Sequence, residues 1–282
     1  MASFVLPHAL HGTGPHKVVA VHGWFADRSA FDPVLPDLDR DAFAYALVDL
    51  RGYGEAKDAP GAYTTAEGAD DVLALADRLG WDRFSVVGHS MGGSVAQRVL
   101  AAAPHRVRRL VGVSRCPPPA AAAAGAVGAV LLRGAHPDSR RTIIDVTTGG
   151  RRPAAWLDRM VRRSLERSDP KAFRAWLDSW ATEGFAAQIE GAAVPALAVT
   201  GALDPALSAE LMRQTWLRWY ADSELVELPS AGHYAMDESP LELIRAVEDF
   251  LRADDGGSDG DGRDDGPRGE GSDARNDRPA AR

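Results

Sequence analysis

Residues 88–92 read Gly-His-Ser-Met-Gly, which places a serine hydroxyl between small neighbours. A serine attacks a carbonyl carbon well only when a base removes its proton. The G-x-S-x-G pattern presents such a hydroxyl when it joins a strand to a helix, because the sharp turn exposes the serine and glycine relieves the crowding. Here the apolar run 84–87 precedes the motif and a helix-like run, 94–103, follows it. We therefore predict that Ser90 is a nucleophile.

A histidine must lie within hydrogen-bonding reach of Ser90 to act as its base. The chain has eight histidines, and His233 follows the last apolar run and precedes a capped helical pattern. A loop in that position can deliver an imidazole to the end of a sheet where a nucleophilic turn lies. His89 occupies the variable position of the motif, where we expect its side chain to point away from the reacting group. His233 is therefore the predicted base.

A carboxylate must hold the imidazole in the correct tautomer and stabilise its cationic form. Asp204 lies just past the apolar run 196–199 and is the first choice, although it could instead cap the turn before Pro205. Asp237, four residues beyond His233, is the main rival. The sequence leaves both carboxylates open as the partner of the histidine.

Two backbone amides are needed to stabilise the charge that develops on a carbonyl oxygen under attack. The amide of Met91 directly follows the serine, and the loop that begins with His22-Gly23-Trp24 contains a glycine that lets the backbone turn inward. We predict that the amides of Trp24 and Met91 form this oxyanion hole. The indole of Trp24 either walls the acyl pocket or serves plain packing.

These residues are separated by short apolar runs that alternate with amphipathic helical patterns. The alternation is typical of a mainly parallel central sheet with helices on both faces, an α/β fold. Capping boxes at residues 64–67 and 239–242 mark the starts of two of the helices, and Gly80 ends the first. The expected strands are residues 18–21, 44–48, 84–87, 110–113, 196–199 and 225–228.

One stretch interrupts the alternation, because residues 117–193 are helix-like throughout. Helices inserted between two strands of such a sheet can form a cap over the strand ends, where ligands bind. The alternative is that they pack on one face of the sheet. We predict a core of this α/β type over residues 1–116 and 194–253, a helical cap over 117–193, and a disordered, acidic, Gly-rich tail over 254–282.

The composition excludes several classes of function. A net charge of −8 argues against nucleic acid and anionic membrane surfaces as partners. The single cysteine, Cys116, rules out a disulfide framework and a cysteine-rich metal site, and no apolar run reaches the length of a membrane span. Because the sequence shows no apolar leader, a cytoplasmic protein is the expectation. The serine chemistry predicted above requires no metal and no organic cofactor, and it implies a small-molecule acyl substrate.

Taken together, these motifs resemble the α/β-hydrolase superfamily, and within it the small bacterial branch of serine esterases, enol-lactonases and perhydrolases. The resemblance rests on the loop at His22, the segment 49–54 (Asp-Leu-Arg-Gly-Tyr-Gly), the serine turn, and the loops of Asp204 and His233. It runs from about residue 18 to about residue 251. The order serine, aspartate, histidine is the one that this fold uses. The chain departs from the family at Glu55, where a serine is usual, and in its short N-terminal segment.

The resemblance implies hydrolysis of a small carboxylic ester, thioester or lactone through an acyl-enzyme on Ser90. Two alternatives remain open at this point. One is acyl transfer or perhydrolysis by the same three residues, and the other is a catalytically silent ligand-binding protein of this fold.

Ending the chain after Ala253 should change neither the melting temperature nor ester hydrolysis. The tail has only alanine for apolar content, so it cannot bury enough surface to offset the entropy lost on ordering. Thermal unfolding and activity of the full and shortened chains check this. A fall of several degrees in melting temperature would show that the tail packs on the body.

Overall fold

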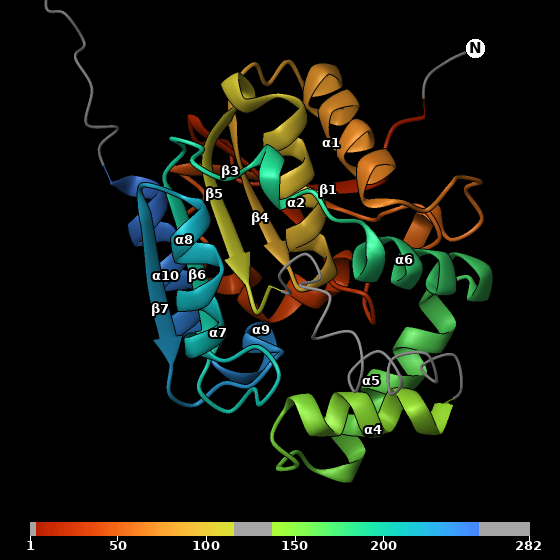
Figure 1. The fold of residues 1–282 in the computed structure, drawn as a ribbon. Helices are drawn as coiled ribbons and strands as arrows, with labels where there is room; N and C mark the ends of the chain where they lie inside the picture. The colour runs from red at the N-terminus through yellow and green to blue at the C-terminus, as the bar shows by residue number, and fades with distance from the viewer. Residues whose placement is uncertain (1–3, 116–136, 254–282) are drawn as a thin grey trace, which may run out of the picture. The chain divides into compact units, whose positions relative to one another are not determined.

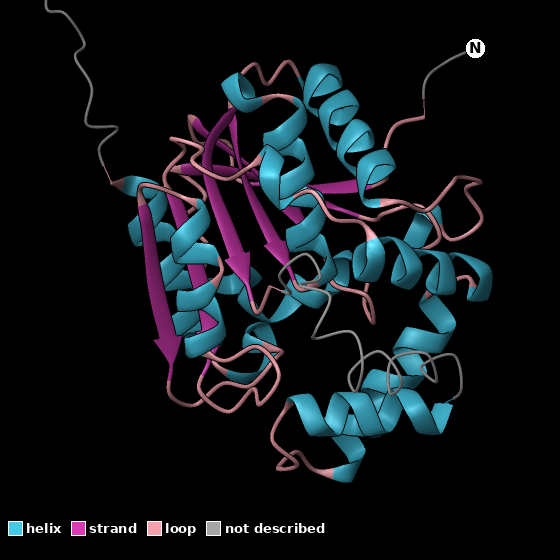
Figure 2. Cartoon of the chain, viewed as in Figure 1, coloured by secondary structure: helices cyan, strands magenta, loops and turns pink. Residues whose placement is uncertain are grey.

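Seven strands form one sheet in the computed structural model, which describes residues 4–115 and 137–253. The strand order is β1-β3-β2-β4-β5-β6-β7, and every neighbouring pair is parallel except β1 and β3 (Figures 1 and 2). The strands are β1 (His8–His11), β2 (His16–Val21), β3 (Phe43–Val48), β4 (Phe84–His89), β5 (Val107–Val113), β6 (Ala196–Gly201) and β7 (Ser223–Leu228).

Helices and short 3₁₀ segments connect the strands, as Figure 2 shows. The α-helices are α1 (Thr65–Leu79), α2 (Met91–Ala102), α4 (Pro137–Thr147), α5 (Ala154–Arg167), α6 (Pro170–Thr182), α7 (Ala209–Gln214), α8 (Trp216–Trp219), α9 (Ala235–Glu238) and α10 (Pro240–Arg252). The 3₁₀ segments are η1 (Arg28–Asp37), η2 (Gly54–Ala56), η3 (Pro104–Arg106) and η4 (Ala186–Gln188).

The sheet is buried on both faces because successive side chains of a strand point in opposite directions. Along β2, Val19 and Val21 pack in one apolar cluster with α1 and α2, whereas Val18 and Ala20 pack in a second cluster with η1 and α10. This double burial explains why the central strands are continuous apolar runs rather than alternating ones. The predicted fold class is confirmed.

All six predicted strands form, but β1 (His8–His11) was missed. It contains two histidines, one of its four residues is exposed, and it pairs antiparallel with β3 at the edge of the sheet. A strand so short and polar carries no apolar pattern, and its position depends on pairing with residues about forty positions away.

The first capping box is present in a modified form. Thr64 accepts a hydrogen bond from the amide of Glu67 at 3.1 Å, and Gly80 ends α1 with a φ of 68°. The Glu67 carboxylate accepts from the amide of Tyr63 rather than from that of Thr64 itself. The exchange still satisfies amides near the helix start, which would otherwise lack partners.

Helices α4, α5 and α6 all lie between β5 and β6 in the chain, as expected for an insertion. Ile143 and Thr147 of α4 line a cavity together with Ser90, so this helix lies over the carboxyl end of β4. The predicted boundaries of the cap stay a prediction, and residues 117–136 of that segment, like the tail, lie outside the described residues.

None of the helices in the described ranges combines the length and apolar character that crossing a bilayer requires.

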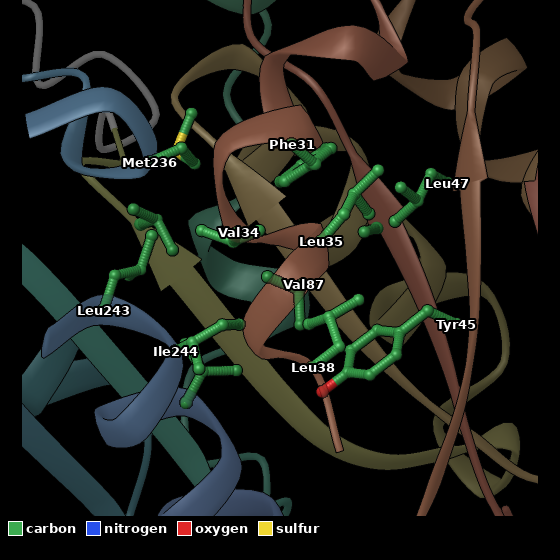
Figure 3. A pocket seen from close by; sticks show the side chains of 13 residues that line it. Phe31, Val34, Leu35, Leu38, Tyr45, Leu47, Val87, Met236, Leu243 and Ile244 are labelled. Carbon is green, nitrogen blue, oxygen red and sulfur yellow. The ribbon is translucent and has the colours of Figure 1, made fainter. Parts of the chain in front are cut away.

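A void of about 30 Å³ remains where η1 crosses the sheet beside α10 (Figure 3). Its lining is apolar apart from the phenol of Tyr45, whose hydroxyl donates to buried Glu248 at 2.9 Å. The lining residues are Ala20, Phe31, Val34, Leu35, Leu38, Tyr45, Leu47, Val87, Val113, Met236, Leu243, Ile244 and Val247.

Replacing Leu243 by alanine should lower the free energy of unfolding by about 3 to 5 kcal/mol, because the lost side chain enlarges an existing void that its neighbours do not fill. Leu241 on the same helix is the matched control, since it is 63% exposed against 3% for Leu243. Its alanine variant should change stability by less than about 0.5 kcal/mol in urea unfolding. Equal losses in the two variants would contradict this packing account.

Candidate active site

Ser90 occupies a sharp turn between β4 and α2, as the motif predicted. Its φ of 51° and ψ of −116° lie in a region that residues with a side chain rarely adopt, so the surroundings must hold it there. The Ser90 amide donates to the carbonyl of Val113 at 2.9 Å, and the Ser90 carbonyl accepts from the amide of Gly93 at 3.0 Å. A side chain at Gly92 would collide with the backbone of β2, which explains the glycine there.

The structure brings Ser90, His233 and Asp204 together. The His233 Nε2 lies 3.0 Å from the Ser90 Oγ, and its Nδ1 lies 2.7 Å from the Asp204 Oδ2. Because a carboxylate only accepts, Nδ1 must carry the proton, which leaves Nε2 free to accept from the serine hydroxyl. The backbone amide of His233 is held by the carbonyl of Thr147 on α4 at 3.0 Å.

Asp204 is buried and remains ionised. Burial by itself raises its pKa, but the imidazole of His233 and two backbone amides outweigh that effect, so the pKa lies below its ordinary value. Those amides belong to Ala206 and Leu207, which donate to the Asp204 Oδ1 at 2.9 and 3.1 Å. The capping role that the sequence offered as an alternative therefore coexists with the contact to the histidine.

Asp237, the rival carboxylate, faces a different neighbour. Its Oδ1 lies 3.6 Å from the Arg159 Nη2, and burial raises its pKa. Asp204 already satisfies the His233 Nδ1. The geometry thus places Asp204, and not Asp237, beside the imidazole.

His89 supports the imidazole, a role that the sequence did not reveal. Its Nε2 donates to the backbone carbonyl of His233 at 2.9 Å, and the two rings lie 5.1 Å apart. Burial and, to a smaller extent, the proximity of His233 lower the pKa of His89 to about 3, so its imidazole stays neutral. No sequence signal could have found this contact, because the two residues are 144 positions apart.

The loop after β2 is fixed against the serine turn. His22 donates from Nδ1 to the carbonyl of Gly23 at 2.9 Å, and its Nε2 accepts from the amide of Leu50 at 3.1 Å. A Cβ at Gly23 would lie 2.6 Å from the His89 Nδ1, so only glycine allows this approach. Within the described ranges, the amides of Trp24 and Met91 donate to no other group of the protein, as an oxyanion hole requires.

Trp24 both packs and lines the site. Its indole Nε1 donates to the carbonyl of Phe173 at 2.7 Å, and the two rings stack with centroids 4.2 Å apart. It also borders a cavity of about 80 Å³ next to the serine and histidine. The lining residues are Trp24, Phe25, Ser90, Ile143, Thr147, Trp180, Ala206, Leu207, His233 and Tyr234.

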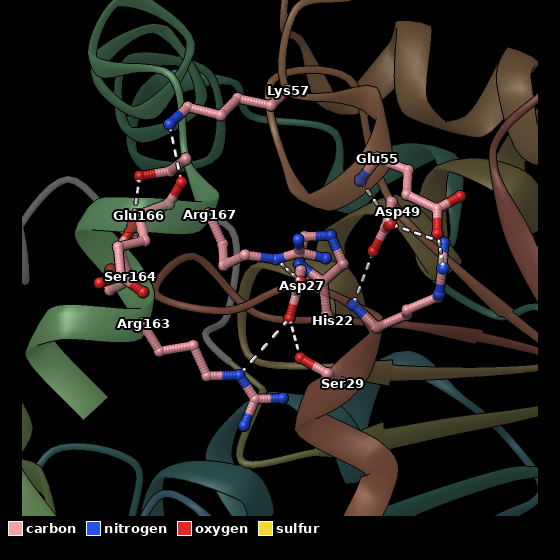
Figure 4. A network of polar contacts seen from close by, with 12 residues as sticks. His22, Asp27, Ser29, Asp49, Glu55, Lys57, Arg163, Ser164, Glu166 and Arg167 are labelled. Carbon is pink, nitrogen blue, oxygen red and sulfur yellow. Dashed lines mark hydrogen bonds and ion pairs between the residues drawn. The ribbon is translucent and has the colours of Figure 1, made fainter. Parts of the chain in front are cut away.

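A buried carboxylate ties this loop to α5 (Figure 4). Asp27 is fully buried and accepts from the Arg167 Nε at 2.6 Å, while the Arg163 Nε lies 3.7 Å away. Ser29 also donates to it. Burial opposes ionisation of Asp27, yet these donors keep its pKa below the ordinary value. The sequence analysis missed this residue, since its partners lie about 140 positions away.

Comparison with known proteins agrees with this architecture. The profile of the family described as alpha/beta hydrolase fold matches residues 17–240. A serine hydrolase-like protein from Dictyostelium discoideum is 35% identical over 98 residues, so the match covers 34% of this chain and only 27% of that protein. The pimeloyl-acyl-carrier-protein methyl ester esterase of Nitrosomonas europaea is 29% identical over 84% of this chain and 96% of that protein. A solved thermophilic esterase from Thermogutta terrifontis is 25% identical, with a TM-score of 0.76 over 88% of this chain and 93% of that chain.

Changing Asp204 to asparagine should reduce kcat by on the order of 10⁴, because the amide no longer fixes the tautomer of His233. Asp237→Asn should keep at least about a tenth of the activity, since Asp237 pairs with Arg159 instead. The measurement is kcat for both variants on one activated ester, after both have shown native melting. The reverse ranking would move the acid to Asp237.

Proposed function

The chain belongs to the α/β-hydrolase family, and we propose that it is a serine hydrolase that cleaves a small carboxylic ester, thioester or lactone. Ser90 is the proposed nucleophile, His233 the base, and Asp204 the acid that orients the base. The observation that carries the proposal is the continuous line of hydrogen bonds from the Ser90 Oγ through the imidazole to the Asp204 carboxylate, at 3.0 and 2.7 Å.

In the first half of the reaction, the Ser90 Oγ attacks the carbonyl carbon while its proton passes to the His233 Nε2. The carbonyl oxygen gains a negative charge, which the amides of Trp24 and Met91 would stabilise by hydrogen bonds. The tetrahedral intermediate then expels the alcohol, thiol or lactone oxygen, which takes the proton back from His233. The acyl group remains on Ser90 as an ester.

Water completes the cycle by the same route. His233 takes a proton from the water molecule as its oxygen attacks the acyl carbon, and then returns a proton to the Ser90 Oγ as the acid leaves. Each proton transfer makes the imidazole cationic for a time. The ionised, buried carboxylate of Asp204 stabilises that cation, which explains why its low pKa matters.

Acyl transfer to an alcohol or amine, and perhydrolysis, would share this acyl-enzyme and differ only in the acceptor. Hydrolysis is the stronger proposal because two of the relatives named above, one matched over most of its sequence and one over most of its structure, are called esterases. A silent binding protein of this fold would have no need for a strained serine held 3.0 Å from a basic nitrogen.

Replacing Ser90 by alanine should leave melting unchanged and reduce turnover of p-nitrophenyl esters by at least about 10⁴-fold, because no acyl-enzyme can form. A fluorophosphonate probe should label the unaltered protein and not the variant. Ser230→Ala is the matched control, since Ser230 lies exposed in the loop before His233 and should keep both labelling and turnover. Near-native activity in folded Ser90→Ala would overturn the mechanism.

A further inference from the structure

Arg140 on α4 is a buried cation without a carboxylate partner in the described part of the chain. It is 2% exposed, and only its Nη1 donates hydrogen bonds, to the hydroxyls of Ser164 and Ser168. The guanidinium lies over the ring of Phe173, 3.6 Å from its centre. Burying a charge without a counter-charge is costly, so an arrangement of this kind requires a reason.

The donor nitrogens that remain on Arg140 lie along one edge of its guanidinium, and that edge can bind an anion. Its Nε is buried without a hydrogen-bond partner, and among the described residues its Nη2 has none either. These two nitrogens point their hydrogens the same way and can hold both oxygens of one carboxylate. Arg51, which is partly exposed, uses such an edge on a carboxylate of the chain, because its Nε and Nη2 both donate to Asp71.

A second donor without a hydrogen-bond partner in the described ranges lies near Arg140, and it belongs to Tyr53. Tyr53 is fully buried, its hydroxyl has no hydrogen-bond partner among residues 4–115 and 137–253, and its backbone is bridged to that of Ser168, a partner of Arg140. Burial raises the pKa of Tyr53 well above its ordinary value, with Arg140 opposing this effect through its charge. The phenol therefore stays protonated and can donate.

The amino-acid sequence restricts where a counter-charge could come from. Residues 116–136, which join the two described ranges, contain no aspartate or glutamate. Burial lowers the pKa of Arg140 to about 10, so the group still carries its charge near neutral pH. No carboxylate of the described residues or of residues 116–136 therefore neutralises the guanidinium.

This cluster adjoins the catalytic cavity. Ile143, three residues or about 4.5 Å further along α4, lines that cavity with Ser90. The ring of Phe173 packs against the guanidinium of Arg140, and it also stacks on Trp24, which lines the cavity. One helical turn and one aromatic ring separate the proposed nucleophile's cavity from Arg140.

We propose that Arg140 and the Tyr53 hydroxyl bind a carboxylate carried by the substrate, so that the preferred ester is one with a free carboxylate on its acyl or alcohol part. This inference rests on the proposed function, because it names the substrate class for the cavity of Ser90. A carboxylate fits better than a phosphate, since one negative charge neutralises one buried cation, whereas a phosphate adds a charge that nothing compensates.

The test compares monomethyl esters of straight-chain dicarboxylic acids with methyl esters of monocarboxylic acids of the same length, with acid release followed at constant pH. The unaltered protein should favour the carboxylate-bearing ester by about tenfold or more in kcat/KM, the effect of a charge-assisted hydrogen-bond pair. Arg140→Met should abolish this ratio, and Tyr53→Phe should reduce it. Arg140→Lys should recover only part of it, because an ammonium lacks the paired edge.

Arg141 provides the matched control, because it neighbours Arg140 on α4 but pairs with Asp158 at the surface. Arg141→Met should keep the full ratio. A wild-type ratio near one, or an Arg140→Met variant that loses both kinds of ester equally, would overturn the proposal and leave Arg140 as a structural link between helices.

A binding measurement separates this inference from the proposed function. Adipate should raise the melting temperature of the unaltered protein relative to chloride of equal ionic strength, and should have no such effect on Arg140→Met.

If no ester of either kind is cleaved, the proposed function fails, and this shift in melting temperature alone decides the anion site. If Arg140→Met does not fold, Tyr53→Phe replaces it, and an undiminished shift in that variant counts against the site. An equal rise with inorganic phosphate would assign the site to phosphate instead.

Discussion

The contact between the buried carboxylate of Asp204 and the His233 imidazole is the interaction on which the rest of the site depends. It requires the loops after β6 and β7 to meet above the turn after β4, and parallel strands make this feasible because their carboxyl ends share one edge. The two loops touch through their backbones. The amide of Leu203 donates to the carbonyl of Ala231 at 2.9 Å, and any side chain at Gly201 would collide with Gly232.

The helices inserted after β5 complete the site from above. The Thr147 carbonyl of α4 holds the amide of His233, and Phe173 of α6 stacks on Trp24. Asp27 ties the loop of Trp24 to α5 through Arg167. Helices α4, α5 and α6 therefore each contact either the proposed base or the loop of the proposed oxyanion donor Trp24, so their position affects the geometry of the candidate site. Asp27 itself is fully buried, so losing its arginine partner would leave a buried charge uncompensated, which is costly.

The proposed anion site on the inserted helices differs from the serine turn in how it is held. The strained serine turn and its glycines are fixed by backbone contacts that admit almost no change, as at Gly92. Arg140 and Ile143, by contrast, lie one turn apart on the inserted helix α4 and not on the sheet. In the proposed function, the reacting residues therefore lie at the sheet edge, and the residues that would recognise the substrate lie on the inserted helices.

The sequence by itself determined the central strands and capped helices, and it indicated Ser90 and His233 as the reacting residues, with Asp204 as the first of two candidate acids. These features rest on local signals, namely apolar runs, capping residues and a motif confined to a few positions. Only the tertiary structure decided that Asp204 rather than Asp237 faces the imidazole, that His89 supports it, that β1 joins the edge, and that the hydroxyls of Ser164 and Ser168 accept from Arg140. The physical reason is sequence separation: these contacts join residues from 24 to 144 positions apart. Such pairs form where the packing of the whole sheet and its helices brings them, and no local pattern encodes that.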